Sequence, residues 1–223
     1  AREKRWADEI TPAILVGDPL HLELKSGRKF LAIYTPNANA VAGVILVHGL
    51  GTHPDCKLMN PLRSLLAEQG YATLSVQMPV LAAGVSSDLY PPLFPEAAER
   101  LQTAIAFLRG QGHGKVAIVS HSQGSRMTNF FLNTIARPQV DAWVAVGIPG
   151  LFTAPESFKA PVLDLFGERD TPVVLDNAAK RSDALRRVRG SAQIEVGGAD
   201  HFFSDQETEL VTQVRQFLDQ KLR

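Results

Sequence analysis

The sequence lacks the features of several classes of protein. Cys56 is the single cysteine in 223 residues, so no internal disulfide can form and a small disulfide-stapled fold is excluded. No unbroken apolar run approaches the roughly 18 residues that a membrane-spanning helix needs. Internal repeats, low-complexity tracts and linkers rich in Gly, Ser or Pro are also missing. We therefore expect one domain over residues 1–223 without a membrane span, in which residues 1–19 form an N-terminal extension.

The sequence also lacks a net charge. Lys plus Arg and Asp plus Glu each number 23, which gives a formal charge of zero at pH 7. No overall field then draws the chain to nucleic acid or to anionic lipid. The 45% of hydrophobic residues and the length of 223 residues are enough for a sizeable core. These values predict a globular protein and give no support to nucleic-acid binding.

Apolar patterns predict the strands. Residues 21–25 and 30–34 alternate around the turn signal Ser26-Gly27, which is typical of a β-hairpin. After this hairpin the apolar runs become continuous, as in strands that are buried on both faces. These runs lie at 44–47, 72–76, 116–119, 143–146 and 162–166, followed by a short one at 192–196.

Segments with helical spacing separate these runs. They lie at 60–69, 95–109, 123–136, 173–188 and 205–222. Strands that alternate with helices of this length predict a mostly parallel sheet with right-handed crossovers and helices on both faces. The predicted fold class is therefore α/β, a three-layer sandwich with an N-terminal antiparallel hairpin. In such sheets chemistry takes place at the carboxyl ends of the strands.

The sharpest motif, Ser120-His121-Ser122-Gln123-Gly124, lies where the strand at 116–119 meets the following helix. It has the form G-x-S-x-G with serine in the first position. The chemistry needs small residues two before and two after the nucleophile, because that serine occupies a strained turn with close neighbours. Ser120 and Gly124 are both small. We therefore predict that Ser122 is a nucleophile, and an ordinary loop is the alternative.

A second block, His48-Gly49-Leu50-Gly51-Thr52-His53-Pro54-Asp55, follows the strand at 44–47. Together with the Ser122 motif, it resembles the α/β-hydrolase superfamily, and the resemblance extends from about Leu20 onward. It implies an α/β-hydrolase-like fold in which the backbone N–H groups of Leu50 and Gln123 form the oxyanion hole. The length of 223 residues leaves no room for a separate cap domain.

The same block, with Ser75-Val76-Gln77-Met78-Pro79, is also similar to a bacterial subfamily whose members are often exported. This similarity implies an exported or periplasmic protein. A cytoplasmic location is the alternative, because a single cysteine leaves the redox compartment open.

The superfamily's chain order of serine, acid and histidine implies two further residues. The stretch Gly-Glu-Arg-Asp that ends at Asp170 is similar to the acid loop of the superfamily, with Glu168 and Asp164 as alternative acids. The stretch Gly-Gly-Ala-Asp-His-Phe-Phe around His201 resembles the histidine loop, and His201 is the only histidine after the acid. The resemblance makes His201 the general base for Ser122 and Asp170 the acid that orients it.

Three residues are candidates for contact with the substrate. His53 lies in the glycine-rich block, where a polar turn residue beside Pro54 is the alternative. His121 directly precedes the nucleophile. Tyr90 lies in the apolar segment 80–95, which either covers an acyl group as a lid or packs over the sheet edge.

Other interpretations of the motifs have less support in the sequence. A dinucleotide fingerprint that starts at Gly49 needs a third glycine where the chain has Pro54, and residues 112–115 precede a strand, unlike a P-loop. His48, His53 and Asp55 lack the tight spacing of a metal site such as H-E-x-x-H. The sequence thus predicts a serine hydrolase of a carboxylic ester or thioester that needs no cofactor and no metal. A catalytically inactive binding module with the same fold is the alternative.

Overall fold

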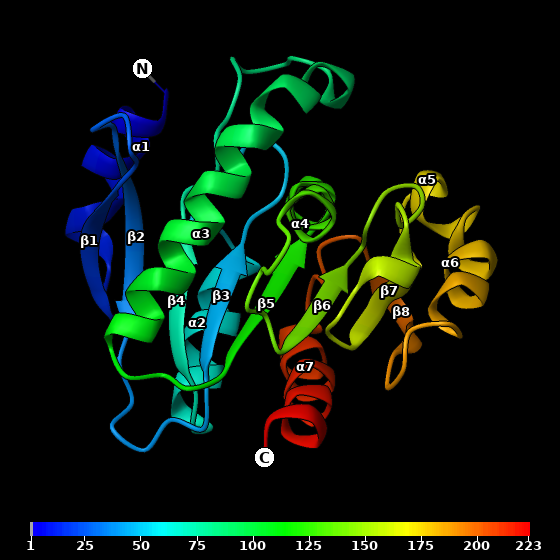
Figure 1. Ribbon diagram of the computed structural model, residues 1–223. Helices are drawn as coiled ribbons and strands as arrows, with labels where there is room; N and C mark the ends of the chain where they lie inside the picture. The colour runs from blue at the N-terminus through cyan, green and yellow to red at the C-terminus, as the bar shows by residue number, and fades with distance from the viewer. Residues whose placement is uncertain (1) are drawn as a thin grey trace.

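One mixed sheet organises residues 2–223, the part of the chain that the computed structural model describes (Figure 1). Its strand order is β1-β2-β4-β3-β5-β6-β7-β8. The strands are β1 (Asp18–Glu23), β2 (Lys29–Thr35), β3 (Gly43–Val47), β4 (Ala72–Val76), β5 (Val116–His121), β6 (Ala142–Val146), β7 (Val162–Arg169) and β8 (Ala192–Asp200). The α/β class and the strand runs predicted from apolar patterns are confirmed. No helix in residues 2–223 combines the length and the apolar character that crossing a membrane requires.

Of the strands in residues 2–223, only β2 runs against the rest of the sheet. β1 pairs antiparallel with β2, and β2 pairs antiparallel with β4. All pairs from β4 to β8 are parallel. Gly27 turns the hairpin with φ +81°, a conformation that glycine adopts without steric cost. The predicted antiparallel hairpin is confirmed, and its first strand begins at Asp18, three residues before the predicted start.

Helices lie on both faces of the sheet (Figure 1). One apolar cluster joins the inner sides of α3 (Phe94–Gly110), α4 (Gln123–Thr134) and α6 (Ala178–Leu185) to one sheet face. A second cluster joins α2 (Met59–Glu68) and α7 (Glu207–Leu222) to the other face. The three-layer arrangement is therefore as predicted.

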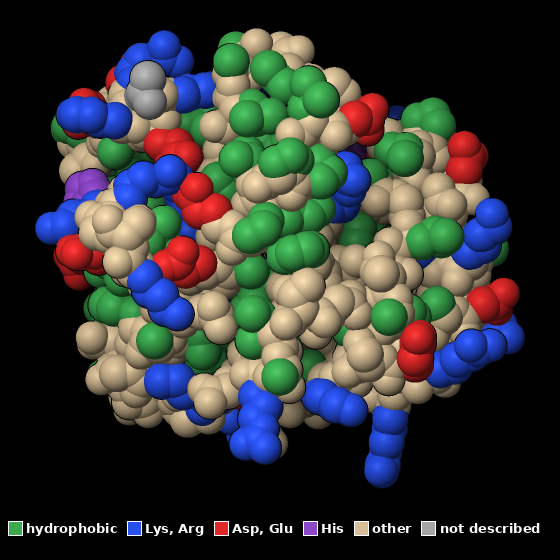
Figure 2. All heavy atoms as spheres, turned by 45° about the horizontal axis from the view of Figure 1, so that its top comes forward, with side chains coloured by type: hydrophobic (Ala, Val, Ile, Leu, Met, Phe, Trp, Pro, Cys, Tyr) green, Lys and Arg blue, Asp and Glu red, His purple; other side chains and the backbone are tan. Residues whose placement is uncertain are grey.

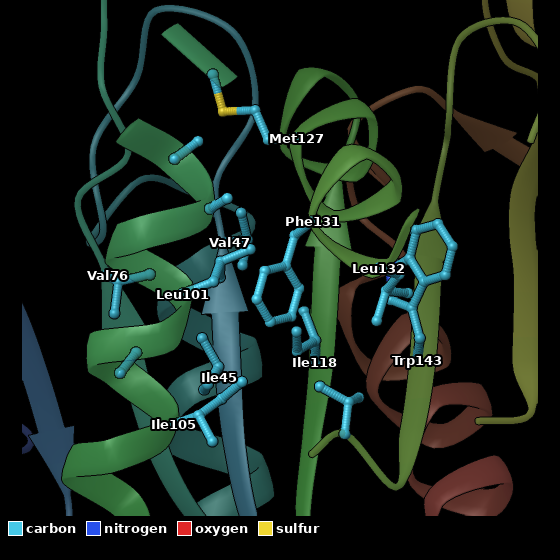
Figure 3. Packing of buried hydrophobic residues seen from close by; sticks show 14 of the residues in the cluster. Ile45, Val47, Val76, Leu101, Ile105, Ile118, Met127, Phe131, Leu132 and Trp143 are labelled. Carbon is cyan, nitrogen blue, oxygen red and sulfur yellow. The ribbon is translucent and has the colours of Figure 1, made fainter. Parts of the chain in front are cut away.

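The larger cluster fixes the strands beneath α3 and α4 (Figure 3). Leu101 and Ile105 of α3 and Phe131 of α4 pack over Ile45 and Ile118 of the two central strands. Burying each such side chain contributes about 1.5–3 kcal/mol. This packing holds the carboxyl ends of β3 and β5, at the upper edge of the sheet in Figure 1, in a fixed relation.

Two helical regions differ from the sequence prediction. Residues 1–19, expected only as an extension, contain α1 (Arg2–Ile10) and a short 3-10 turn, Thr11–Ala13. The helix expected at 173–188 is divided into α5 (Pro172–Leu175) and α6. The carbonyl of Val174 accepts a hydrogen bond from the buried Arg181 guanidinium at 2.8 Å, which gives that carbonyl a partner outside a continuous helix.

Candidate active site

Three polar residues follow the carboxyl ends of strands on one side of the sheet. Ser122 follows β5, Asp170 follows β7 and His201 follows β8. Parallel strands that end at the same edge bring such residues together. The parallel pairing of β5, β6, β7 and β8 places the three residues at one edge although 79 positions separate the serine from the histidine.

The three side chains form one continuous hydrogen-bonded series. His201 Nε2 lies 3.0 Å from Ser122 Oγ, and His201 Nδ1 lies 2.6 Å from Asp170 Oδ1. The Asp170 side chain is fully buried, whereas the His201 side chain keeps 14% of its surface exposed. The backbone N–H of Thr171 also donates to Asp170 Oδ1, at 2.6 Å. An imidazole that donates from Nδ1 to a carboxylate has its Nε2 lone pair directed at the serine hydroxyl.

The two alternative acids have other partners. Asp164 is fully buried and pairs with Arg181 at 2.8 Å, and Gln193 donates to it at 2.7 Å. Burial raises the pKa of Asp164, while Arg181 and Gln193 act in the opposite direction. Glu168 is exposed and accepts the backbone N–H of Gly198 at 2.7 Å. Of the three carboxylates, the structure brings only Asp170 to His201.

The turn around Ser122 explains the residue types in its motif. Ser122 has φ 52° and ψ −119°, a conformation that non-glycine residues rarely adopt. A Cβ atom on Gly124 would lie 2.4 Å from the carbonyl oxygen of His48, so only glycine fits there. Ser120 is fully buried, and its Oγ accepts a hydrogen bond from Trp143 Nε1 at 2.8 Å. Serine therefore replaces glycine in the first position without leaving its hydroxyl unpaired.

The two predicted oxyanion residues are placed differently: Gln123 directly follows Ser122 in the chain, and Leu50 lines the same cavity as Ser122. Gln123 is the first residue of α4, and the first N–H groups of a helix have no acceptor within the helix. The loop that carries Leu50 passes close to Ser122, because a Cβ atom on Gly49 would lie 3.3 Å from Ser122 Cβ. The role of these two N–H groups as an oxyanion hole stays a prediction.

His48 holds the loop that carries Leu50. Its Nδ1 donates to the carbonyl of Gly49 at 2.9 Å, and its Nε2 accepts the backbone N–H of Met78 at 2.9 Å. Burial lowers the pKa of His48 to about 3, so the ring is neutral at pH 7. A neutral ring with one donor and one acceptor nitrogen matches these two hydrogen bonds.

A largely apolar cavity of about 510 Å³ opens beside the serine and histidine. Its walls are Gly49, Leu50, Thr52, Cys56, Lys57, Leu58, His121, Ser122, Thr171, His201 and Phe202. His121 is nine-tenths or more buried in this wall, and its Nε2 donates to the carbonyl of His201 at 2.9 Å. Burial, with the nearby His201, lowers the pKa of His121 to about 4. His121 therefore contacts the histidine loop as a neutral ring.

Two of the predicted substrate contacts lie elsewhere. The His53 ring packs against Trp6 of α1 with a centroid distance of 5.6 Å, and burial lowers the pKa of His53. Tyr90 is 1% exposed within the larger core cluster, and its hydroxyl accepts the backbone N–H of Leu81. Neither residue is part of the cavity wall around Ser122. In the segment 80–95, Tyr90 packs inward while Leu89 stays 63% exposed.

The residues considered for a metal have other partners. Asp55 pairs with Arg63 at 2.7 Å, and His48 holds its loop as described above. Within residues 2–223, no three His, Cys, Asp or Glu side chains are grouped so that they could hold a metal ion.

Arg126, which lies one helical turn after Ser122, was not among the residues predicted from the sequence. It lines a second hollow, of about 590 Å³, that lies along α4. Figure 2 shows the face that carries the upper edge of Figure 1, with hydrophobic side chains gathered over the segment before α3 and a hollow beside them. Residues four apart on a helix lie on the same face, so the spacing of Ser122 and Arg126 in the sequence already indicates that the two residues lie close together.

A family model matches most of the chain. Residues 44–220 match the model of the Alpha/beta hydrolase family. The chain belongs to the alpha/beta hydrolase family. The matched range starts in β3, ends in α7 and contains Ser122, Asp170 and His201. A search of curated proteins gives no match.

Solved structures share the fold of this alpha/beta hydrolase. A dienelactone hydrolase from Anabaena variabilis is 20% identical with a TM-score of 0.75, over 93% of this chain and 98% of that one. An esterase of Pyrococcus furiosus is 15% identical with a TM-score of 0.76, over 93% and 92% of the two chains. A Xanthomonas campestris protein, described as a serine hydrolase without a lid, is 16% identical with a TM-score of 0.71, over 94% and 96%. At these identities the likeness is one of fold.

Proposed function

We propose that this alpha/beta hydrolase is a serine hydrolase that cleaves a carboxylic ester or thioester through an acyl-enzyme on Ser122. The observation that carries the proposal is the series of two hydrogen bonds from Ser122 through His201 to the buried Asp170, beside an apolar cavity. The similarity in fold to an esterase and to a dienelactone hydrolase supports chemistry on an ester bond.

Acylation begins when Ser122 Oγ attacks the carbonyl carbon of the substrate. His201 Nε2, 3.0 Å away, takes the hydroxyl proton in this step. The carbonyl oxygen becomes an oxyanion, and the backbone N–H groups of Leu50 and Gln123 stabilise it. When the tetrahedral intermediate collapses, the bond to the alcohol or thiol breaks and His201 returns the proton to that leaving group.

Deacylation repeats these steps with water. His201 Nε2 takes a proton from a water molecule, which attacks the acyl carbon, and then returns the proton to Ser122 Oγ as the acid leaves. Asp170 keeps the proton of the neutral ring on Nδ1 and stabilises the imidazolium form. Because the Asp170 side chain is fully buried, water screens this interaction little.

A covalent probe tests the proposal. A fluorophosphonate should label Ser122, as located by peptide mass spectrometry, and Ser122→Ala should abolish both labelling and ester hydrolysis while the protein stays folded. We expect a loss of a thousandfold or more, on the order seen when a nucleophile is removed. Ser204→Ala, at an exposed serine outside the cavity, is the control and should keep full activity. Labelling elsewhere, or an active Ser122→Ala variant, would refute the proposed function.

A further inference from the structure

A groove along α4 is separate from the cavity beside His201. The two have no lining residue in common. The groove has a volume of about 590 Å³ and both polar and apolar walls. Asp88, Phe94 and Arg126 are among its lining residues. Arg126 is the only cationic side chain in this lining.

Arg126 lies close to the nucleophile. Its backbone N–H donates to the carbonyl of Ser122 at 3.3 Å, so the two residues occupy one turn of α4. Helix side chains incline toward the N-terminus, which directs the Arg126 side chain to the end of α4 where Ser122 lies. The Arg126 guanidinium therefore extends toward the end of α4 that carries Ser122, where it contacts Gln123.

Arg126 differs from the fully buried arginines of the protein in having no carboxylate partner. Arg63, Arg100 and Arg181 each pair with an Asp or Glu. Within residues 2–223, no carboxylate oxygen lies within 4.0 Å of the half-buried Arg126. Its Nη1 donates only to the neutral Gln123 Oε1, at 3.3 Å, and its guanidinium carbon lies 5.8 Å from the Phe94 ring centroid.

The neighbouring amide has a spare donor too. Gln123 is 2% exposed, and its Nε2 has no hydrogen-bond partner among residues 2–223. This buried amide and the Arg126 guanidinium, which has no carboxylate partner in residues 2–223, thus lie side by side. Asp88 is the only acidic residue that lines the groove; it is exposed, and Ser86 Oγ donates to it at 3.4 Å. The local charge near the nucleophile therefore favours an anion.

We propose that the groove binds the acyl arm of the ester and that Arg126 anchors a terminal carboxylate on that arm. This inference rests on the proposed function. His201 must protonate the oxygen of the leaving alcohol, so the alcohol lies on the side of His201. Because His201 and Phe202 line the other cavity, we assign the alcohol to that cavity and the acyl arm to the groove. A guanidinium presents paired N–H donors that match a carboxylate. The substrate class is then a half-ester of a dicarboxylic acid.

Two esters with acyl arms of equal length test this inference. Hydrolysis of monoethyl adipate and of ethyl hexanoate is followed by ethanol release, in wild type and in Arg126→Met and Arg126→Lys. We expect wild type to prefer the adipate, and Arg126→Met to lower kcat/KM for it about tenfold or more, mainly through KM, as expected for loss of a charge-assisted hydrogen bond. Ethyl hexanoate should change less than about twofold. For the adipate, kcat/KM of Arg126→Lys should lie between the values of wild type and Arg126→Met.

A charge control and a pair of esters that differ by a carboxylate on the alcohol side sharpen the test. Asp88→Asn, which removes the acidic side chain from the groove, should raise kcat/KM for the adipate at low salt; a fall like that of Arg126→Met would overturn the charge assignment. If Arg126 instead governs a preference for 4-carboxyphenyl butyrate over phenyl butyrate, the assignment of the acyl arm is overturned.

The outcomes separate the two proposals. If wild type cleaves ethyl hexanoate but shows no preference for the adipate, or if Arg126→Met affects both esters equally, the groove inference falls and the serine hydrolase stands. If wild type cleaves neither ester and no serine takes the fluorophosphonate, the proposed function falls as well.

Discussion

Three carboxylates lie on β7 or directly after it, and each has a different partner. Asp164 pairs with the buried Arg181, Glu168 accepts a backbone N–H from Gly198, and Asp170 accepts from His201. Their surroundings differ as well, since Asp164 and Asp170 are buried and Glu168 is exposed. Removing each charge should therefore affect a different property of the protein.

Amide substitutions at these positions should separate catalysis from stability. Asp170→Asn keeps the size of the side chain but offers His201 the wrong hydrogen-bonding group, so kcat should fall on the order of ten-thousandfold. Glu168→Gln should keep nearly full activity. Asp164→Asn leaves Arg181 buried without its counter-charge and should lower the free energy of unfolding by about 3–5 kcal/mol. Steady-state kinetics and urea unfolding measure the two effects; a crippled Glu168→Gln beside an active Asp170→Asn would reverse the acid assignment.

At the scale of elements, α1 connects the N-terminus of the chain to the loops of the candidate site. Arg2 donates to the carbonyl of Gly51 at 2.8 Å and to that of Leu81 at 3.0 Å. Glu3 pairs with the fully buried Arg100 at 2.8 Å. The residue next to Gly51 is Leu50, whose N–H is a proposed oxyanion donor. The helix thus holds this donor from outside the site.

Removing the contact of Arg2 should therefore lower turnover. We expect Arg2→Ala to reduce kcat up to about tenfold with a smaller change in KM. Without the contact of Arg2, the loop shifts and the Leu50 N–H no longer lies where it stabilises the oxyanion. Lys4→Ala is the control on the same helix, since the exposed Lys4 pairs only with Asp8. Kinetics on one short neutral ester measure both variants. Equal activity of the two would show that the loop does not need the contact of Arg2.

The sequence predicted well those elements whose local apolar pattern marks them, and it predicted less well those that depend on contacts with distant residues. The continuous apolar runs of β3 to β7 mark strands because burial on both faces is a local property of the sequence. The helix α1 has no buried residue, and the Arg2 and Glu3 side chains attach it to the loop at Gly51 and to Arg100 of α3, so no apolar stripe marked it. The break between α5 and α6 likewise coincides with a contact of the buried Arg181.

The same distinction applies to the candidate site. The motif and chain order predicted which residues the structure brings together at Ser122, because the turn and the strand ends fix them. The location of His53 and Tyr90 depends on packing against α1 and within the core, which local sequence does not reveal. Arg126 was missed because its distinguishing property, the lack of a carboxylate partner, is a property of its surroundings.

At the scale of the whole molecule, two buried neutral histidines at the carboxyl edge of the sheet make the free energy of unfolding depend on pH. His48 fixes the loop after β3, and His121 contacts the backbone of His201 after β8. Burial lowers their pKa values to about 3 and about 4, against an ordinary value of 6.5. The unfolded chain therefore binds protons in a pH range where the folded chain does not. Acid should destabilise the molecule through these rings.

The sign and the pH range of this effect can be tested on His121. Above pH 6.5 the ring is neutral in both the folded and the unfolded state, and its full contribution to stability is present. As the pH falls from 6.5 toward 4, only the unfolded state gains the proton. The free energy of unfolding therefore falls, by about 3 kcal/mol for His121 at pH 4. His121→Gln retains an amide donor for the His201 carbonyl but does not titrate, and should remove that part of the fall. His21→Gln, at an exposed histidine, should keep the wild-type fall. Urea unfolding at pH 7, 5 and 4 gives the free energy of unfolding of all three proteins. If acid lowers this free energy as much in His121→Gln as in wild type, the His121 ring does not cause the fall.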